Sequence, residues 1–383
     1  MHIPSEFDTI RPFEPEELPE VFDRLLADKQ FLQVLAFLYP GVSLDAIAAK
    51  MRSCKTNLDF QRTFCYGFLE QLLAKAAKGC DMDTSAVDNR RRYTFISNHR
   101  DIVLDSALLD KLLIDAGFTT TCEIAIGDNL LSLPWVKDLV RVNKSFIVER
   151  SLSPREMLLA SRRLAEYMHF AIAVKQENIW IAQREGRAKN SDDRTQEAIL
   201  KMMAMGGEGT LIDRLVSLHI VPLTISYEYD PCDYLKAAEF QLKRDVPGWR
   251  KSATDDVVSM RTGIMGYKGR IHYHCSPCID EWLLQMDTSA GKQAVLQAIA
   301  HHIDEEIHRR YRLYPCNYVA LDLMLGTTAY RSHYTADDQA AYEKYLSGQL
   351  AKIDIPNKDE AFLRARIIEM YANPAKNFLA AQS

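Results

Sequence analysis

Over most of the first 85 residues, apolar side chains recur at every third or fourth position. This spacing is typical of amphipathic helices, and it predicts helices over residues 16–27, 31–38, 44–51 and 60–77. Residues 81–92 are polar and are predicted to form a linker. The pattern therefore indicates a helical N-terminal region, residues 1–88.

From residue 93 onward, short β-prone runs alternate with helical patterns. Strands are predicted over residues 93–97, 119–125, 145–148, 178–182, 220–227 and 270–274. Helices are predicted between them, over residues 105–116, 154–174, 195–205 and 211–218. Strands separated by helices indicate an α/β fold, with a mixed, mainly parallel sheet flanked by helices and with functional loops at the strand ends. This pattern defines a second region, residues 89–285.

After residue 285 the helical spacing returns, and helices are predicted over residues 291–312, 317–325 and 336–352. Residues 286–383 are therefore expected to form a helical C-terminal region that packs on the α/β region. A membrane-spanning helix needs about 20 predominantly apolar residues. The best run begins at Phe31 and is interrupted by Gln33, Pro40 and Gly41, so we expect that the chain does not cross a membrane.

Charge and cysteine content narrow the classes of function. The formal net charge of −5 over 383 residues is too small to indicate a nucleic-acid-binding protein. Any functional basic surface must therefore be local. The eight cysteines are spread along the chain without a compact framework, and no secretory pattern opens the sequence. Reduced thiols in a cytoplasmic protein are therefore expected.

The strongest candidate for catalysis follows the first strand of the second region. His99 leaves that strand at a turn, and Asp101 and Asp105 stand two and six residues later. One ring nitrogen of a histidine can take a proton from a hydroxyl group while a carboxylate fixes the tautomer through the other nitrogen. Histidine titrates close to neutral pH without special tuning. A solvated loop histidine beside an acidic helix start is the alternative interpretation of this short pattern.

Three further short patterns follow along the chain: Ser145-Phe146-Ile147-Val148-Glu149-Arg150, Glu185-Gly186-Arg187-Ala188-Lys189 and Val221-Pro222. With Asn98-His99 they occur in the order, and at roughly the separations, of four sequence blocks of the glycerolipid acyltransferase superfamily. Residues 90–285, about half of the chain, thus resemble this superfamily, which includes the glycerol-3-phosphate and lysophosphatidate acyltransferases.

The resemblance implies a glycerol-3-phosphate acyltransferase-like fold and a role for each block. His99 would be the general base, and Asp105 or Asp101 would orient it. Substrate binding would fall to Phe146, Arg150, Glu185, Gly186, Arg187, Lys189 and Pro222. Arginine and lysine suit an anionic acceptor because they form charge-assisted hydrogen bonds with phosphate. Surface ion pairs with Glu149, Asp192 and Asp193 are the alternative role for these basic residues.

The sequence departs from the superfamily pattern in two blocks. The superfamily places its aspartate five residues after the histidine, where this chain has Leu104, and Asp105 comes one residue later. One residue is a rotation of about 100° on a helix. Asp105 is the favoured partner because it stands just before an apolar run, and Asp101 is the alternative. The third block is also shortened between Gly186 and Lys189, which affects the identity of the acceptor more than the type of reaction.

The resemblance implies an O-acyltransferase that moves a fatty acyl group from acyl-CoA or acyl carrier protein to a hydroxyl of glycerol-3-phosphate or a lysophospholipid. A phosphate-free, amino-acid-type lipid is the alternative acceptor, and a non-catalytic lipid-binding protein of the same fold is the rival function. No metal, no prosthetic group and no nucleic acid is expected. Cys275 and Cys278 have zinc-knuckle spacing, but a strand is favoured there because no second cysteine pair exists.

Peripheral contact with the cytoplasmic face of a membrane is expected from the same resemblance. The apolar segment around Trp135 could lie in a membrane interface, where tryptophan is favoured. Packing in the protein core explains this segment equally well.

Overall fold

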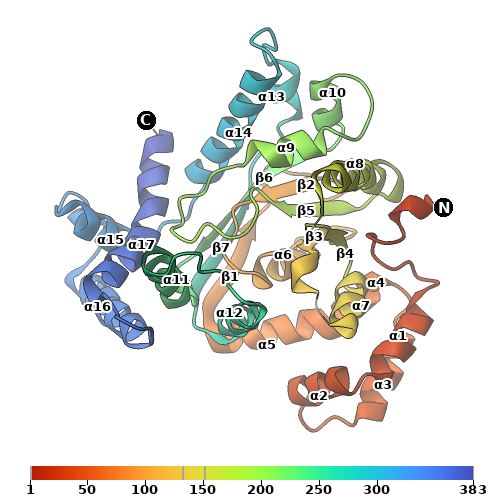
Figure 1. Cartoon of the computed structure of the whole chain (residues 1–383), viewed down its shortest axis with the longest axis horizontal. Coiled ribbons are helices and arrows are strands. Elements are labelled where there is room, and N and C mark those ends of the chain that lie inside the picture. Colours follow the sequence, from red (N-terminus) through yellow and green to blue (C-terminus); the bar gives the residue numbers. More distant parts are fainter. Residues whose placement is uncertain (1, 132, 151, 383) are drawn as a thin grey trace.

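The computed structural model describes residues 2–131, 133–150 and 152–382, and it confirms the α/β class. Its centre is a seven-stranded sheet in the order β1-β7-β6-β2-β5-β3-β4 (Figure 1). Neighbouring strands run parallel except β6 and β7, which are antiparallel. The strands are β1 (Ala77–Asp83), β2 (Thr94–Ser97), β3 (Cys122–Gly127), β4 (Ser145–Val148), β5 (Asn178–Ala182), β6 (Ile220–Tyr227) and β7 (Gly269–Cys275).

Helices cover both faces of the sheet. Phe95 and Trp180 belong to the core on one face, where they pack with α5 (Gly67–Ala76) and α6 (Leu104–Asp115). Ile96 and Ile181 belong to the core on the other face, with α8 (Pro154–Phe170), α9 (Glu197–Met203) and α14 (Lys292–Arg309). Strands that are buried on both faces read as continuous apolar runs. β6 is such a strand, since it is buried along its whole length.

The N-terminal helices have a small core of their own beside the sheet. This core joins α1 (Leu18–Ala27), α2 (Lys29–Leu38), α3 (Leu44–Ser53) and α4 (Asn57–Phe60) to α7 (Pro134–Val142). Asp28 Oδ1 accepts hydrogen bonds from the first free N–H groups of α2, and Ser43 Oγ accepts one at the start of α3. Such caps set where a helix begins. Trp135 packs on Phe31 with ring centroids 5.8 Å apart, so it is part of this core.

The C-terminal helices lie on the opposite side of the molecule (Figure 1). They are α15 (Pro315–Leu325), α16 (Ala336–Ala351) and α17 (Glu360–Gln382). Together with α11 (Asp233–Asp245) they enclose a core rich in tyrosine, to which Tyr314, Tyr342 and Tyr371 contribute. Through α11, which follows β6, this unit is fixed to the sheet.

Two parts of the sequence-based element prediction were wrong. The segment Ala77–Asp83, expected to end a helix and begin a linker, is the edge strand β1 and pairs with β7. Its mostly polar sequence shows little strand pattern because β7 is its single partner in the sheet. In addition, the helices α7, α11, α12 (Ala253–Met265) and α17 were not among the predicted elements. Among the described residues, no helix is long and apolar enough to cross a membrane.

Candidate active site

The parallel strands bring the predicted site residues to one edge of the sheet. β2, β5, β3 and β4 run in the same direction, so their carboxyl ends meet at that edge. His99 lies two residues beyond β2, Arg150 two residues beyond β4, and Glu185 three residues beyond β5. Crevices at the carboxyl ends of parallel strands are the usual ligand sites of open α/β sheets.

His99 is paired with Asp105, which stands in the first turn of α6. The distance from His99 Nδ1 to Asp105 Oδ2 is 2.8 Å. The same oxygen accepts hydrogen bonds from the backbone N–H groups of Arg100, at 2.6 Å, and Asp101, at 3.0 Å. Since a carboxylate only accepts, Nδ1 carries the proton of the neutral imidazole and Nε2 is left as the proton acceptor. The His99 side chain is 14% exposed.

The turn that carries His99 is anchored by the two residues that precede the histidine. The amide of Asn98 exchanges two hydrogen bonds with the backbone of Ile225 in β6, at 2.9 and 2.8 Å. Trp180 of β5 donates to the hydroxyl of Ser97 at 3.0 Å. The indole and the His99 ring meet edge to face, with ring centroids 5.7 Å apart. Buried hydrogen bonds of this kind fix a side chain's position because breaking them leaves unpaired polar groups.

Asp101, the alternative partner of His99, is hydrogen-bonded to the start of α6 and not to the histidine. Its Oδ1 accepts from the backbone N–H groups of Val103 and Leu104, at 2.9 and 2.8 Å, and so caps the start of α6. Burial raises the pKa of the Asp101 carboxyl, and the nearby Asp105 acts in the same direction. Gly263 of α12 is packed against this carboxyl so closely that a Cβ there would lie 1.9 Å from Oδ2.

The second and third sequence blocks meet each other at the sheet edge. Arg150 Nη1 lies 3.4 Å from Glu185 Oε1, and both side chains are substantially exposed to solvent. Gly127 makes room for Arg150, because a Cβ at residue 127 would lie 2.7 Å from its Nε. Gly186 has φ +68° in an open turn. Glycine adopts this left-handed conformation without strain, as the turn interpretation requires.

Arg187 and Lys189 reach a second side of the site. Arg187 lines a cavity of about 270 Å³, whose wall also includes Lys236, Trp249 and Lys251. The Nη1 atom of Arg187 is buried without a hydrogen-bond partner. Lys189 contacts Glu239 of α11. Burial, together with the neighbouring cations Lys243 and Lys251, lowers the pKa of Lys189 to about 7. Glu239 pairs with both Lys189 and Lys243, and an anion bound here would add to this compensation of positive charge.

A larger apolar cavity of about 300 Å³ lies along α6. Leu104, Ala107 and Ile114 of α6 line one side, and Phe31 and Leu35 of α2 line the opposite side. The rest of the wall comes from α3, α4, α5, α7, α12 and the π-helical segment Gln61–Tyr66. The cavity therefore lies between α6 and the N-terminal helices. Leu104, next to Asp105 in sequence, lines it, whereas Asp105 and His99 do not. No sequence block pointed to it, because its walls come from helices spread over the chain from Phe31 to Ile264.

Two residues predicted to bind substrate lie in the hydrophobic core instead. Phe146 is fully buried in the core, where its ring lies 5.5 Å from that of Tyr167. Pro222 is buried inside β6, opposite Ile96, and its carbonyl oxygen accepts from the backbone of Ser276. Neither residue lines the two cavities described above. In this structure Phe146 and Pro222 have a packing role, and substrate binding by these two residues stays a prediction.

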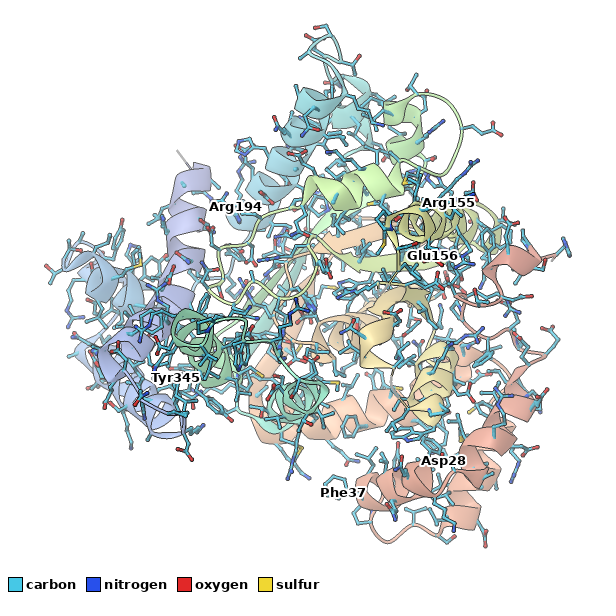
Figure 2. All side chains as sticks on the ribbon, viewed as in Figure 1. Asp28, Phe37, Arg155, Glu156, Arg194 and Tyr345 are labelled. Carbon is cyan, nitrogen blue, oxygen red and sulfur yellow. The ribbon has the colours of Figure 1, made fainter. Side chains whose placement is uncertain are left out.

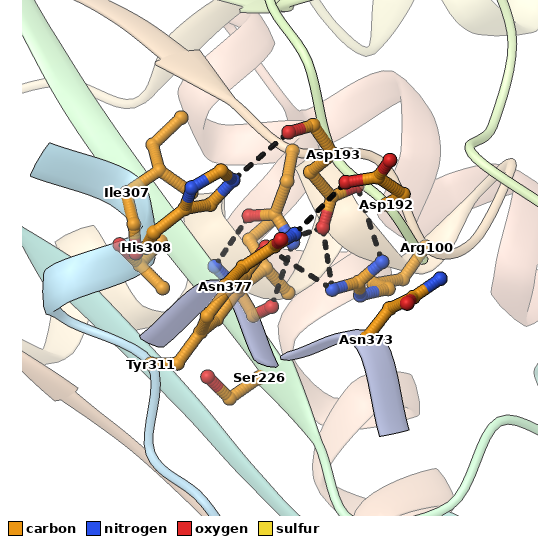
Figure 3. A network of polar contacts seen from close by, with 12 residues as sticks. Arg100, Asp192, Asp193, Ser226, Ile307, His308, Tyr311, Asn373 and Asn377 are labelled. Atoms are coloured by element: carbon orange, nitrogen blue, oxygen red, sulfur yellow. Dashed lines mark hydrogen bonds and ion pairs between the residues drawn. The ribbon is translucent and has the colours of Figure 1, made fainter. Parts of the chain in front are cut away.

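Sequence reasoning missed a group of buried charges beside His99 (Figure 3). Arg100 Nη2 lies 2.6 Å from Asp193 Oδ2, and Tyr311 donates to the same carboxylate. Lys236 of α11 donates to the backbone oxygen of Arg100 at 3.0 Å. Burial opposes the charge of Arg100, but Asp193 and Tyr311 outweigh it, so the pKa of Arg100 is raised. The only signal in the sequence was Arg100 itself, next to His99.

A separate cluster lies at the other end of the strands. His219 Nδ1 is 2.6 Å from Asp280 Oδ2, and the ligand atoms of these residues and of Cys278 lie within 4.8 Å of one another. Arg91 lies 3.9 Å from the same Asp280 oxygen and already supplies a cation there. Cys275, the other cysteine of the zinc-knuckle spacing, is fully buried in the sheet core.

The comparisons with known proteins give a similarity in structure and no match in sequence. No family model matches the sequence, and no curated protein matches it. Among solved structures, the chain is similar to the 1-acyl-sn-glycerophosphate (LPA) acyltransferase PlsC from Thermotoga maritima. That similarity covers 76% of this chain and 95% of that chain, at 12% sequence identity and a TM-score of 0.38. At this level the likeness does not establish a shared reaction.

Proposed function

We propose that this protein is an O-acyltransferase that moves a fatty acyl group from a thioester donor to a hydroxyl of a lipid precursor. The observation that carries the proposal is the His99–Asp105 pair, with Nε2 left as proton acceptor. The apolar cavity is lined by Leu104, next to Asp105 in sequence, and the basic pocket is lined by Lys236, which donates to the backbone oxygen of Arg100. Acyl transfer to an alcohol needs a base, a place for a hydrocarbon chain and a place for the acceptor. These three needs match the three features of the site.

In the proposed reaction His99 acts as general base. Nε2 takes the proton of the acceptor hydroxyl as its oxygen attacks the thioester carbonyl carbon. The C–S bond then breaks, and the imidazolium returns the proton to the thiolate that leaves. Asp105 holds the tautomer and stabilises the imidazolium while it carries the proton. The products are an ester and a free thiol, and no group beyond the two substrates is consumed.

The two cavities support separate places for the two substrates. The apolar cavity along α6 suits the acyl chain, because each buried methylene contributes about 0.8 kcal/mol. Arg187 and Lys189 suit the negative charge of an acceptor such as glycerol-3-phosphate or a lysophospholipid, because charge-assisted hydrogen bonds are stronger than neutral ones. Arg150 and Glu185 lie at the same edge of the sheet as His99. Acyl-CoA and acyl carrier protein both remain candidate donors in this proposal.

Contact with a membrane surface from the cytoplasmic side is part of the proposal, since the acceptor and product are lipids. The turn between α2 and α3 supports it. Phe37, in the last turn of α2, is 75% exposed and lies at the bottom of the view in Figure 2, and Val42, in the turn that follows, is 49% exposed. Exposed apolar side chains gathered on one turn can enter the boundary between headgroups and acyl chains.

The test is release of free thiol from palmitoyl-CoA, measured with and without glycerol-3-phosphate or lysophosphatidate. We expect release that depends on the acceptor and that is lost in His99→Ala. Because removal of a general base typically costs about 10²- to 10⁴-fold in rate, the residual rate is expected near background. His301→Ala is the matched control, since His301 is exposed on α14 and outside the site.

The outcomes separate the competing functions. Release that is unchanged in His99→Ala would overturn the proposed base. Release that requires a phosphate-free hydroxy-lipid, and ignores both phosphorylated acceptors, would overturn the acceptor alone. Tight binding of the fatty acyl thioester without acceptor-dependent release would instead indicate a non-catalytic lipid-binding protein.

A further inference from the structure

Arg100, the residue after His99, is held at three points of its structure. Its backbone N–H donates to Asp105 Oδ2 at 2.6 Å, the oxygen that also pairs with His99. Its backbone oxygen accepts from Lys236 of α11 at 3.0 Å. Its guanidinium pairs with Asp193, and the two side chains are 6% and 0% exposed. Any displacement of Arg100 would therefore move the turn that positions His99.

Asp193 connects this turn to the segment that carries Arg187 and Lys189. It stands four residues after Lys189, in the connection between β5 and α9. Its backbone oxygen lies 2.9 Å from His308 Nε2 at the end of α14, and its carboxylate accepts from Tyr311 (Figure 3). The buried ion pair therefore joins the base to the basic residues of the proposed acceptor site.

The C-terminal helix α17 fixes the same connection from outside. Asn377 Nδ2 donates to Asp192 Oδ1 at 3.1 Å, and Asn373 Nδ2 donates to the backbone oxygen of Asn190 at 2.8 Å. Figure 3 shows Asn373 and Asn377 beside the Arg100–Asp193 pair. The C-terminal region thus reaches to within two hydrogen-bonded contacts of the His99 turn.

We propose that the Arg100–Asp193 ion pair, braced by Tyr311 and α17, is a positioning device that sets the place of His99 relative to the acceptor. Arg100 and Asp193 touch neither substrate in this proposal, which rests on the proposed acyl transfer. The reason for a buried pair is physical. A buried charge without its partner is strongly unfavourable, so the two segments can be buried only in the one arrangement that joins the pair.

The test is a double-mutant cycle with Arg100→Met, Asp193→Asn and the double variant. Each single variant leaves one charge buried without a partner, whereas the double variant leaves none. We expect each single change to lower kcat by about 10- to 100-fold, as small misplacements of catalytic groups do. We expect the KM for the acceptor to rise and the KM for the acyl donor to stay constant. The double variant is expected to recover part of kcat. Tyr311→Phe provides a milder fourth variant that retains both charges.

The pH–rate profile gives a readout that lost folding would not produce. The charged or titratable groups that face Arg100 are Asp193, Tyr311, Asp230, Lys236 and Asp105. Arg100→Met removes a cation near the base, so the acidic limb of kcat/KM should move to higher pH. Asp193→Asn leaves that cation uncompensated, so the limb should move to lower pH. The double variant should lie between the two single variants.

A second buried pair offers a matched control. Lys175 Nζ lies 2.8 Å from Glu123 Oε1, and these side chains are 7% and 1% exposed, but they lie away from the His99 turn. Lys175→Met should lower stability without changing either KM or the pH profile. If the Arg100 and Asp193 variants behave like Lys175→Met, the positioning role is overturned. If wild-type thiol release does not depend on His99, the proposed acyl transfer falls first and the positioning role falls with it.

Discussion

At the scale of single residues, the orientation of the His99 ring and of the turn around it depends mainly on one oxygen atom. Asp105 Oδ2 accepts from His99 Nδ1 and from two backbone N–H groups. In Asp105→Asn the amide cannot accept all three bonds and hold the same tautomer. We expect kcat for acceptor-dependent thiol release to fall by about 10²- to 10⁴-fold, with little change in either KM.

The neighbouring Asp101 provides the comparison for this prediction. Asp101→Ala removes the cap of α6, so we expect the free energy of unfolding to fall by about 1 kcal/mol. Because Asp101 does not contact His99, kcat should stay within a few-fold of wild type. Chemical unfolding and thiol release on the same preparations measure both effects. A larger loss of kcat in Asp101→Ala than in Asp105→Asn would reverse the two roles.

Lys189 predicts a pH dependence for the binding of an anionic acceptor. Its pKa is lowered to about 7 by burial and by neighbouring cations, so the ammonium is charged below that pH and loses its charge above it. The KM for glycerol-3-phosphate is therefore expected to rise, by about tenfold, between pH 6 and pH 8, since a hydrogen bond to a charged group contributes about 1.5–3 kcal/mol. Steady-state kinetics across this range measure the effect.

Two variants separate Lys189 from other lysines. Lys189→Met should raise KM and remove most of its change between pH 6 and pH 8. Lys201→Met, on the exposed side of α9, should leave the wild-type pH dependence intact. A KM that does not vary with pH in wild type would contradict an anionic group bound at Lys189.

At the scale of elements, α6 connects the base to the acyl cavity. Asp105 lies in its first turn, and Ala107 of the same helix lines the cavity. Ala107→Trp should fill part of that space and shorten the longest acyl chain accepted. Each methylene that loses its place costs about 0.8 kcal/mol, which is about fourfold in kcat/KM. A series of acyl-CoA substrates from eight to eighteen carbons would show the shift, and Ala86→Trp, on an exposed loop, is the control.

The turn between α2 and α3 predicts a surface for membrane contact. Phe37→Asp places a charge at a side chain that is 75% exposed, so the fold should be unaffected. Sedimentation with vesicles of phosphatidylethanolamine and phosphatidylglycerol should weaken by about tenfold, because burial of a large apolar side chain contributes about 1.5–3 kcal/mol. Leu158 is 62% exposed on α8, and Leu158→Asp should bind as wild type does. Equal losses in the two variants would argue against a specific docking turn.

At the scale of the whole molecule, local patterns predicted most elements of the sheet because burial on both faces gives short apolar runs. β4 and β5 begin and end where the sequence indicated. β1 was missed because its sequence, AKGCDMD, is stabilised by pairing with residues almost 200 positions away. α11 follows the same logic, since positions that look polar in the sequence are buried by distant segments. Lys236 is buried against Arg100, and Gln241 against Asn357 in the connection between α16 and α17.

The candidate site shows the same difference between contacts that are local in the sequence and contacts that are long-range. The pairing of His99 with Asp105 could be predicted because it spans six residues. The contact between Arg100 and Asp193 spans 93 residues, and the walls of the apolar cavity come from segments between Phe31 and Ile264. Contacts of this range depend on how the elements pack, which no local pattern records. For the same reason Phe146 looked like part of a binding motif although it serves the core.

The attachment of the C-terminal helices to the sheet predicts how stability changes with pH. Asp233 of α11 accepts hydrogen bonds from Tyr345 and Tyr371, both at 2.8 Å. Burial, with a contribution from Asp230, raises its pKa to about 7. The folded protein therefore holds a proton at Asp233 more tightly than the unfolded chain does. This contribution to stability is fully present below the pKa of the unfolded chain, near 3.8, and is lost as the pH rises through about 7.

Between pH 5.5 and pH 7, this group should lower the free energy of unfolding by at most about 1.4 kcal/mol per pH unit. Asp233→Asn keeps an acceptor for Gln349 and offers N–H donors to the two tyrosine oxygens without any charge to bury. It should therefore flatten the pH dependence and make the protein more stable than wild type at pH 8. Urea unfolding at four pH values between 5.5 and 8 measures both. If Asp233→Asn retains the wild-type slope, the pH dependence originates elsewhere in the molecule. Burial of the Asp233 carboxylate then does not lower the free energy of unfolding.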